Sequence, residues 1–272
     1  MEHEVNKIYN EDCLTAFQKI PSKSIDCIVT SPPYWKGFEY EAYFNSYKQY
    51  LDWSKIWLKE CKRVLKDNGT FYLNVINDSE ITIRAYEMME IATRELMFKL
   101  HDTIIWYRYN QQPANTNRQL TNQCEFIFML RHTSAGVELH KEELYKKIPY
   151  IFKTKNVGNV WEIPFNSGSN SKPSGFGRKE TKSKWGHSGF PLEIPTACIL
   201  LSTNEGDIVL DPFIGSGTTA MACRNLKRNY IGFELNKEYY DIAVDRVNGV
   251  SQEGEQLKGN GVVDLFNFIE EE

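Results

Sequence analysis

Short apolar runs that end on polar residues recur along the chain. Four of them cover residues 7–9, 26–29, 207–210 and 230–233. The first polar residues that follow these runs are Asn10, Thr30, Asp211 and Glu234. Apolar runs of this length, bounded by polar residues, predict buried strands.

Helical patterns lie between these runs. Apolar residues at three- and four-residue steps predict a helix over 47–65, stopped by the Asp-Asn-Gly turn at 67–69. A strand over 70–75, a helix over 80–99 and strands over 103–107 and 124–130 follow. Strands alternating with helices predict an α/β fold with a parallel, doubly wound sheet, whose ligands bind at the carboxyl ends of the strands. The polar residues named above are expected to line that edge.

Composition narrows the class of protein. The six cysteines form no CxxC pair and the five histidines no HExxH spacing, so we expect free thiols and no metal site. The charged start MEHEVNK lacks the apolar core of a signal peptide, and no apolar run reaches the ~20 residues of a membrane-spanning helix. These features predict a cytoplasmic protein without a membrane partner.

Residues 30–35 leave the second predicted strand as Thr-Ser-Pro-Pro-Tyr-Trp. Each proline fixes its own φ and pushes the preceding residue out of the helical region, so Ser31 and Pro32 are expected to be extended. Their carbonyl oxygens then form rigid acceptors, and Tyr34 adds a flat face beyond them. The segment predicts a rigid acceptor site for a ligand that carries N–H groups.

Residues 211–219, DPFIGSGTT, join the third predicted strand to a helix of small residues. Gly215 and Gly217 let the backbone pass close to a ligand, and Glu234 ends the next strand, where an acid is expected to bind ribose hydroxyls. A phosphate-binding P-loop would need a lysine after the glycines, and a dinucleotide fold a third glycine. Asp211 before the glycines instead suits a cationic ligand such as S-adenosylmethionine.

Together, TSPPYW, DPFIGSGTT and the later FELNKEYYDIA resemble the bacterial amino-group DNA methyltransferases, whose motifs read [DNS]PP[YFW] and DPFxGSGTT. The catalytic motif precedes the cofactor loop, an order similar to the circularly permuted beta class. The resemblance implies an S-adenosylmethionine-dependent, Rossmann-like methyltransferase sheet. Its halves are residues 1–131 (catalytic) and 187–250 (cofactor-binding), separated by a target-recognition insert at 132–186 and followed by an acidic tail at 251–272.

The same resemblance implies the roles of individual residues. Hydrogen bonds from an exocyclic base amine to Ser31 and the Pro32 carbonyl would aim the nitrogen lone pair at the methyl group, with a flipped-out base stacked on the ring of Tyr34. The phenol oxygen of Tyr34 has no role in this scheme. The implied catalytic residues are Ser31, Pro32, Pro33 and Tyr34. The implied cofactor-binding residues are Asp12, Cys13, Asp211, Pro212, Phe213, Gly215, Ser216, Gly217, Thr218 and Glu234. The segment 187–191 resembles a weaker motif that closes over methionine.

Serine in the first motif position favours cytosine N4 as the methylated atom, with adenine N6 as the alternative. Methylation of a cytosine ring carbon needs a cysteine, usually in a Pro-Cys pair, and no proline here precedes a cysteine. Two rival functions remain: methylation of RNA or of a protein glutamine, and a DNA-binding protein that has lost catalysis. Motif order and intact motif residues favour neither.

The charge distribution agrees with a double-stranded DNA partner. The chain carries a net charge of −4, yet residues 146–188 hold nine Lys/Arg against two acids. A basic block on an acidic body binds phosphates locally, because screening limits each contact to ~8–10 Å. The block alone is equally compatible with a solvated loop. Together with the resemblance, it predicts a DNA-facing insert, in an enzyme that belongs with a cognate restriction endonuclease.

Overall fold

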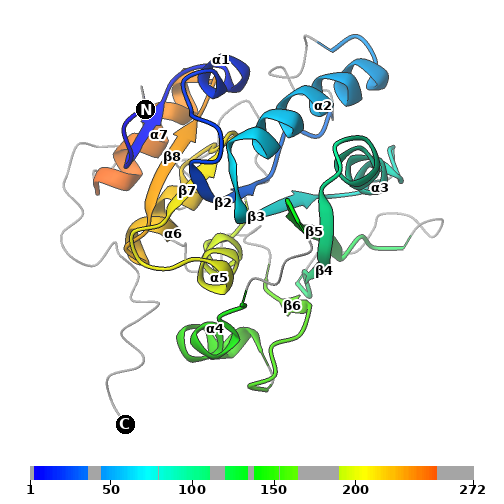
Figure 1. Cartoon of the computed structure of the whole chain (residues 1–272). Coiled ribbons are helices and arrows are strands. Elements are labelled where there is room, and N and C mark those ends of the chain that lie inside the picture. Colours follow the sequence, from blue (N-terminus) through cyan, green and yellow to red (C-terminus); the bar gives the residue numbers. More distant parts are fainter. Residues whose placement is uncertain are drawn as a thin grey trace.

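The computed structural model describes residues 3–35, 44–78, 80–110, 120–133, 138–152, 154–164 and 190–249. In these residues eight strands form one sheet in the order β1-β8-β7-β2-β3-β5-β4-β6 (Figure 1). The strands are β1 (Lys7–Tyr9), β2 (Ile25–Thr30), β3 (Leu65–Val75), β4 (Lys99–Tyr107), β5 (Cys124–Arg131), β6 (Val160–Glu162), β7 (Ile208–Asp211) and β8 (Asn229–Phe233).

Helices cover both faces of this sheet. One layer consists of α1 (Cys13–Phe17), α2 (Tyr47–Val64) and α3 (Arg84–Glu90), which continues as the π-turn η2 (Ile91–Glu95). The other consists of α4 (Lys141–Lys147), α5 (Glu193–Ser202), α6 (Thr218–Asn225) and α7 (Lys237–Asn248), with the short 3-10 turn η3 (Pro149–Ile151). No helix among the described residues is both long and apolar enough to cross a membrane.

The central strands alternate between the two layers. Cys27 and Val29 of β2 pack in the cluster under α5, and Ile28 packs in the cluster under α1 and α2. All three are at most 2% exposed, which explains why the strand is apolar on both faces. The doubly wound α/β architecture is therefore confirmed.

The expectation of a wholly parallel sheet is wrong at one side. Strands β1, β8, β7, β2 and β3 run parallel, but β5 is antiparallel to both β3 and β4. The chain returns directly beside β4, without the helical crossover that a parallel neighbour requires. The sequence analysis also missed β6, which pairs parallel with β4 and buries Trp161. It lies in the predicted insert, so part of that segment extends the sheet.

The helix predicted over 80–99 is shorter than expected. The side chain of Asp78 accepts hydrogen bonds from the backbone N–H groups of Glu80 and Ile81, and this turn delays the helix until Arg84. The helix then widens into the π-turn and ends before Met97, whose φ is +58°. The strand predicted over 70–75 begins earlier, because Leu65 already pairs with Ile25.

Candidate functional site

The two motifs lie at the carboxyl ends of neighbouring strands. Ser31 follows β2 and Asp211 ends β7, and these strands pair although nearly two hundred residues separate them in sequence (Figure 1). The connections from β2 and β7 lead to opposite sides of the sheet, so this is a topological switch point, where α/β sheets bind ligands. The hydroxyl of Thr30 donates a 2.6 Å hydrogen bond to Asp211 Oδ1, which ties the two segments together.

Asp211 is directed into the protein. Its carboxylate also accepts hydrogen bonds from the Thr219 hydroxyl at 2.6 Å and the Phe213 N–H at 3.1 Å, and its residue is 2% exposed. Burial raises the pKa of Asp211 to about 6, although the hydrogen bonds from Thr219, Thr30 and Phe213 act in the opposite direction. Of the two positions expected for Asp211, the methionine end or the loop's own N–H groups, the structure shows the second.

The glycines give the loop its shape. Gly215 and Gly217 have φ values of +54° and +85°, in the left-handed region that favours glycine. A Cβ on Gly217 would lie 3.1 Å from the Cβ of Ala243, so a side chain there would press against α7. A Cβ on Gly215 would meet nothing within 4 Å, so the loop is open on that side. The open side is where a ligand can approach the backbone.

The remaining loop residues divide between packing and support. Pro212 is buried, and the ring of Phe213 packs against Trp57 and Trp53 at centroid distances of 5.1 and 5.5 Å. Ser216 and Thr218 receive the guanidinium of Arg246, whose Nη1 lies 3.1 Å from Thr218 Oγ1. Burial lowers the pKa of Arg246 to about 10. Sequence reasoning missed Arg246, because a lone arginine in a surface helix carries no motif signal.

Glu234 closes the loop from the next strand. Its carboxylate accepts the Gly215 N–H at 3.0 Å and the Asn236 N–H at 2.8 Å. Burial is the largest cause that raises the pKa of Glu234 to about 7, and the charge of Asp211 adds to it. Asn10, after β1, donates to the backbone oxygen of Glu234 at 2.8 Å. The predicted polar edge is thus continuous from β1 to β2.

Asp12 and Cys13 occupy less exposed positions than a ligand contact would suggest. The Asp12 carboxylate accepts hydrogen bonds from the N–H groups of Leu14 and Thr15, so it caps α1. Cys13 is 5% exposed, and burial raises the pKa of its thiol. Both residues stand at the carboxyl end of β1, beside the Glu234 strand. Their predicted contact with the cofactor adenine stays a prediction.

In the catalytic segment the two hydroxyl groups meet. The Ser31 hydroxyl is in hydrogen-bond contact with the Tyr34 hydroxyl, which also lies 3.3 Å from the backbone oxygen of Asn74. Tyr34 is only 6% exposed and packs in the core cluster under α2. Its ring is therefore not the open platform that the sequence suggested. Asn74, near the end of β3, was not among the predicted site residues.

Buried charges surround Tyr34. The guanidinium carbon of Arg84 lies 5.8 Å from the centre of the ring, and Arg84 Nη1 donates to Ile76 O and Asp78 Oδ2, both at 2.9 Å. On the neighbouring hairpin, Arg108 and Glu125 form an ion pair at 3.1 Å with both side chains at most 7% exposed. Burial raises the pKa of the Tyr34 phenol well above its usual range, and the charge of Glu125 acts in the same direction.

Some predicted residues lie outside the described part of the chain. These include positions 165–189, with the basic cluster Lys179, Lys182 and Lys184 and most of the segment 187–191. Of that segment, Phe190 and Pro191 are described, and both are buried.

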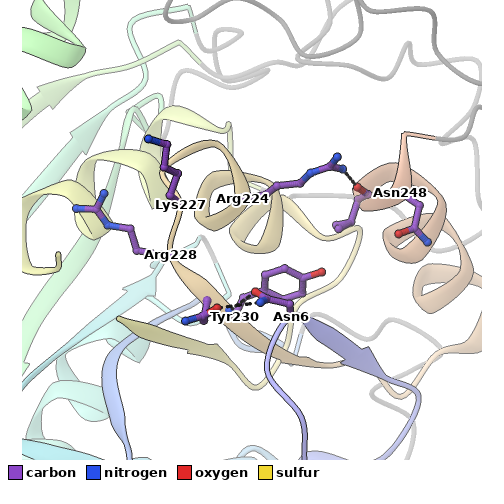
Figure 2. Close-up of a pocket in the computed structure, with 8 residues that line it drawn as sticks. Asn6, Arg224, Lys227, Arg228, Tyr230 and Asn248 are labelled. Atoms are coloured by element: carbon purple, nitrogen blue, oxygen red, sulfur yellow. Dashed lines mark hydrogen bonds between the residues drawn. The ribbon is translucent and has the colours of Figure 1, made fainter. Parts of the chain in front are cut away.

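A cavity of about 440 Å³ opens at the opposite edge of the sheet, near the amino end of β8 (Figure 2). Arg224, Lys227 and Arg228 line it, but each is already paired within the protein. Arg228 donates to Thr203 and Leu226, Arg224 to the backbone oxygen of Val247, and Lys227 lies 3.6 Å from Glu205. This cavity is separate from the switch point.

The fold and the switch-point residues define the class of protein. A glycine loop with left-handed backbone, an open approach at Gly215 and a carboxylate on the next strand fit a nucleoside cofactor, and the acidic residues beside it fit one with positive charge. The lack of a lysine in the loop argues against a triphosphate. These features fit S-adenosylmethionine and define a methyltransferase.

Comparison with known proteins identifies the family. The DNA methylase family profile matches residues 25–245, and the chain belongs to this family. It is 31% identical over 278 residues to the Type II methyltransferase M.Cfr9I of Citrobacter freundii, with 89% of this chain and 87% of that protein covered. It is therefore an S-adenosylmethionine-dependent, site-specific DNA methyltransferase of the N4/N6 amino-group family.

Solved structures show the same fold. The PvuII DNA methyltransferase (cytosine-N4-specific) superposes with a TM-score of 0.71 at 22% identity, covering 97% of this chain and 92% of that chain. TTHA0409, a DNA modification methylase described as putative from Thermus thermophilus, complexed with S-adenosyl-L-methionine, superposes with a TM-score of 0.62 at 23% identity, covering 89% and 92%. The fold prediction and the cofactor prediction are confirmed.

Proposed function

We propose that the protein transfers the methyl group of S-adenosylmethionine to the N4 amine of a flipped-out cytosine in duplex DNA. The observation that carries the proposal is the Thr30–Asp211 hydrogen bond, which joins the Ser31 segment to the cofactor loop at one strand junction. Ser31 in the first motif position favours cytosine. That the PvuII enzyme is cytosine-N4-specific supports the same choice.

The residues of the chain would act by binding and orientation. Glu234 is placed to accept ribose hydroxyls, and the backbone at Gly215 and Gly217 to contact the cofactor closely. When bound, the cofactor supplies a methyl group already activated on a sulfonium. The Ser31 hydroxyl and the Pro32 carbonyl would accept the two N–H bonds of the amine and direct its lone pair. As the N–C bond forms, the S–C bond breaks, and the amine releases one proton to solvent.

Base flipping would supply the amine at this site, because the amine is not accessible within a duplex. Stacking on Tyr34 requires neighbouring side chains to uncover the ring when DNA binds, since it is 6% exposed. We assign DNA recognition to 132–186 on the basis of its positive charge. A cognate restriction endonuclease is a functional partner in this proposal, as the Type II name of M.Cfr9I suggests.

The test is methyl transfer from tritium-labelled cofactor to duplex DNA, RNA and protein in parallel, followed by mass analysis of digested DNA. We expect label in DNA alone and N4-methylcytosine as the product. N6-methyladenine would keep the mechanism and overturn the base, and label in RNA or protein alone would overturn the substrate. The Ser31→Ala variant serves as the reference for enzyme-dependent label.

A further inference from the structure

A line of three polar groups leads from the acceptor site into the sheet. The Ser31 hydroxyl contacts the Tyr34 hydroxyl, and the Tyr34 oxygen lies 3.3 Å from Asn74 O and 3.4 Å from Asn74 Oδ1. Tyr34 and Asn74 are 6% and 3% exposed. The line therefore connects the proposed amine acceptor to a buried amide at the end of β3.

The chemistry of Asn74 gives this line a direction. Its Nδ2 donates to the backbone oxygen of Phe126 at 3.2 Å, which orients Oδ1 toward Tyr34, since the opposite orientation would place two oxygens together. Both Asn74 atoms near the phenol are carbonyl oxygens and can only accept. Burial keeps the pKa of Tyr34 high, so the phenol retains the proton that it donates to Asn74.

With its own proton directed at Asn74, the Tyr34 oxygen receives the proton of Ser31. The lone pairs of the Ser31 oxygen then remain for an outside donor. In the reverse direction Ser31 would present its proton to the amine, and two donors would face each other. The hydroxyl of a serine is equally able to donate or accept, so its neighbours decide which role it takes.

We propose that the Tyr34 hydroxyl and Asn74 are positioning residues that hold Ser31 as a hydrogen-bond acceptor for the target amine. This inference rests on the proposed function and adds residues to it. It reverses the expectation from sequence, in which the phenol oxygen has no role and Tyr34→Phe is mild. The Ser31–Tyr34 contact is the observation that changes it.

The test is a double-mutant cycle on the single-turnover rate of methyl transfer, measured with DNA and cofactor saturating. Tyr34→Phe should lower the rate by roughly tenfold, about the worth of one neutral hydrogen bond. In a Ser31→Ala background the same change should alter the rate by less than about twofold, because no serine proton is left to orient. Cofactor affinity should stay the same in all variants.

A second cycle keeps the test decisive if Ser31→Ala is too slow to measure. Asn74→Leu removes one of two acceptors and should lower the rate by roughly threefold, with no further loss in a Tyr34→Phe background. Tyr72→Phe removes a phenol oxygen from the fully buried part of β3 and is the matched control, with an unchanged rate expected.

Two outcomes would overturn the inference. One is a Tyr34→Phe rate within about twofold of wild type, and the other is an equal loss in both backgrounds, as a merely structural role would give. The proposed function is tested separately by the wild-type enzyme. A wild type that methylates DNA while either cycle is additive leaves the function standing and removes only the positioning role.

Discussion

Replacing Asp211 with asparagine should make the fold more stable above neutral pH. The pKa of this buried carboxyl is raised to about 6 from its ordinary value of 3.8, mainly by burial. The folded chain therefore holds the proton more tightly than the unfolded chain. The stability that the protonated group provides is present below pH about 4 and is lost as pH rises through about 6.

The magnitude follows from the size of this change. A rise from 3.8 to about 6 corresponds to roughly 3 kcal/mol, at about 1.36 kcal/mol for each pKa unit. Asparagine resembles the protonated acid and carries no charge. Its oxygen can accept from Thr30 and the Phe213 N–H, and its amide can donate to Thr219, whose hydroxyl can reverse its role. We expect Asp211→Asn to gain up to roughly 3 kcal/mol at pH 8 and little at pH 4.

The assay is urea unfolding followed by tryptophan fluorescence at several pH values between 4 and 8. The wild type should lose stability across this range, and Asp211→Asn should lose less of it. The remaining slope is expected from Glu234, whose pKa is raised to about 7. Asp241→Asn, on the exposed face of α7 beside Lys237, is the matched control and should keep the wild-type slope. Equal destabilisation of Asp211→Asn at every pH would refute the reasoning, because hydrogen bonds to the ionised group would then outweigh its burial.

Three further predictions concern the cofactor, the DNA and the core. Glu234→Gln should weaken S-adenosylmethionine binding and reduce the rise in wild-type affinity as pH passes about 7, since the ionised carboxylate is the better acceptor; calorimetric titration measures both. Neutralising the basic cluster Lys179, Lys182 and Lys184 should flatten the slope of log K against log salt by about 0.9 for each phosphate that the protein no longer neutralises, and an unchanged slope would exclude phosphate binding by this cluster. Arg84→Met should cost about 3 kcal/mol of stability and slow methyl transfer, while Arg94→Met, at an exposed pair with Glu90, should cost under about 1 kcal/mol; similar losses would contradict a role for the buried charge.

Strand ends were the part of the site that the sequence could predict. Apolar runs followed by Thr30, Asp211 and Glu234 mark strands, and parallel strands bring their carboxyl ends to one edge whatever their order in the chain. The glycines of the loop were predictable for a similar reason, because their conformation is a local property. The hydrogen bonds that join Thr30 to Asp211 and Glu234 to Gly215 place these residues together.

Contacts between distant segments were not predictable in the same way. Asn74 looks like any polar residue near the end of a strand, and only the pairing of β3 with β2 brings it to Tyr34. Arg246 reaches the loop because α7 packs against α6, and Arg84 reaches Tyr34 because an Asp78 turn sets where α3 begins. A single polar residue acquires such a role from tertiary packing, which leaves no periodic signal in the sequence.

The opening prediction has a functional counterpart. Asp211 and Glu234 are two acids near one loop, each with a raised pKa, so their charges are unfavourable in the folded chain without ligand. A ligand that brings positive charge to this loop offsets that cost, and S-adenosylmethionine carries a sulfonium. The same two charges should therefore lower the stability of the free protein and favour the bound cofactor. Asp211→Asn is expected to separate these effects: the free protein gains stability at pH 8 while cofactor affinity falls, a trade-off common at binding sites. A variant that gained both would show that the buried charge of Asp211 has no part in binding.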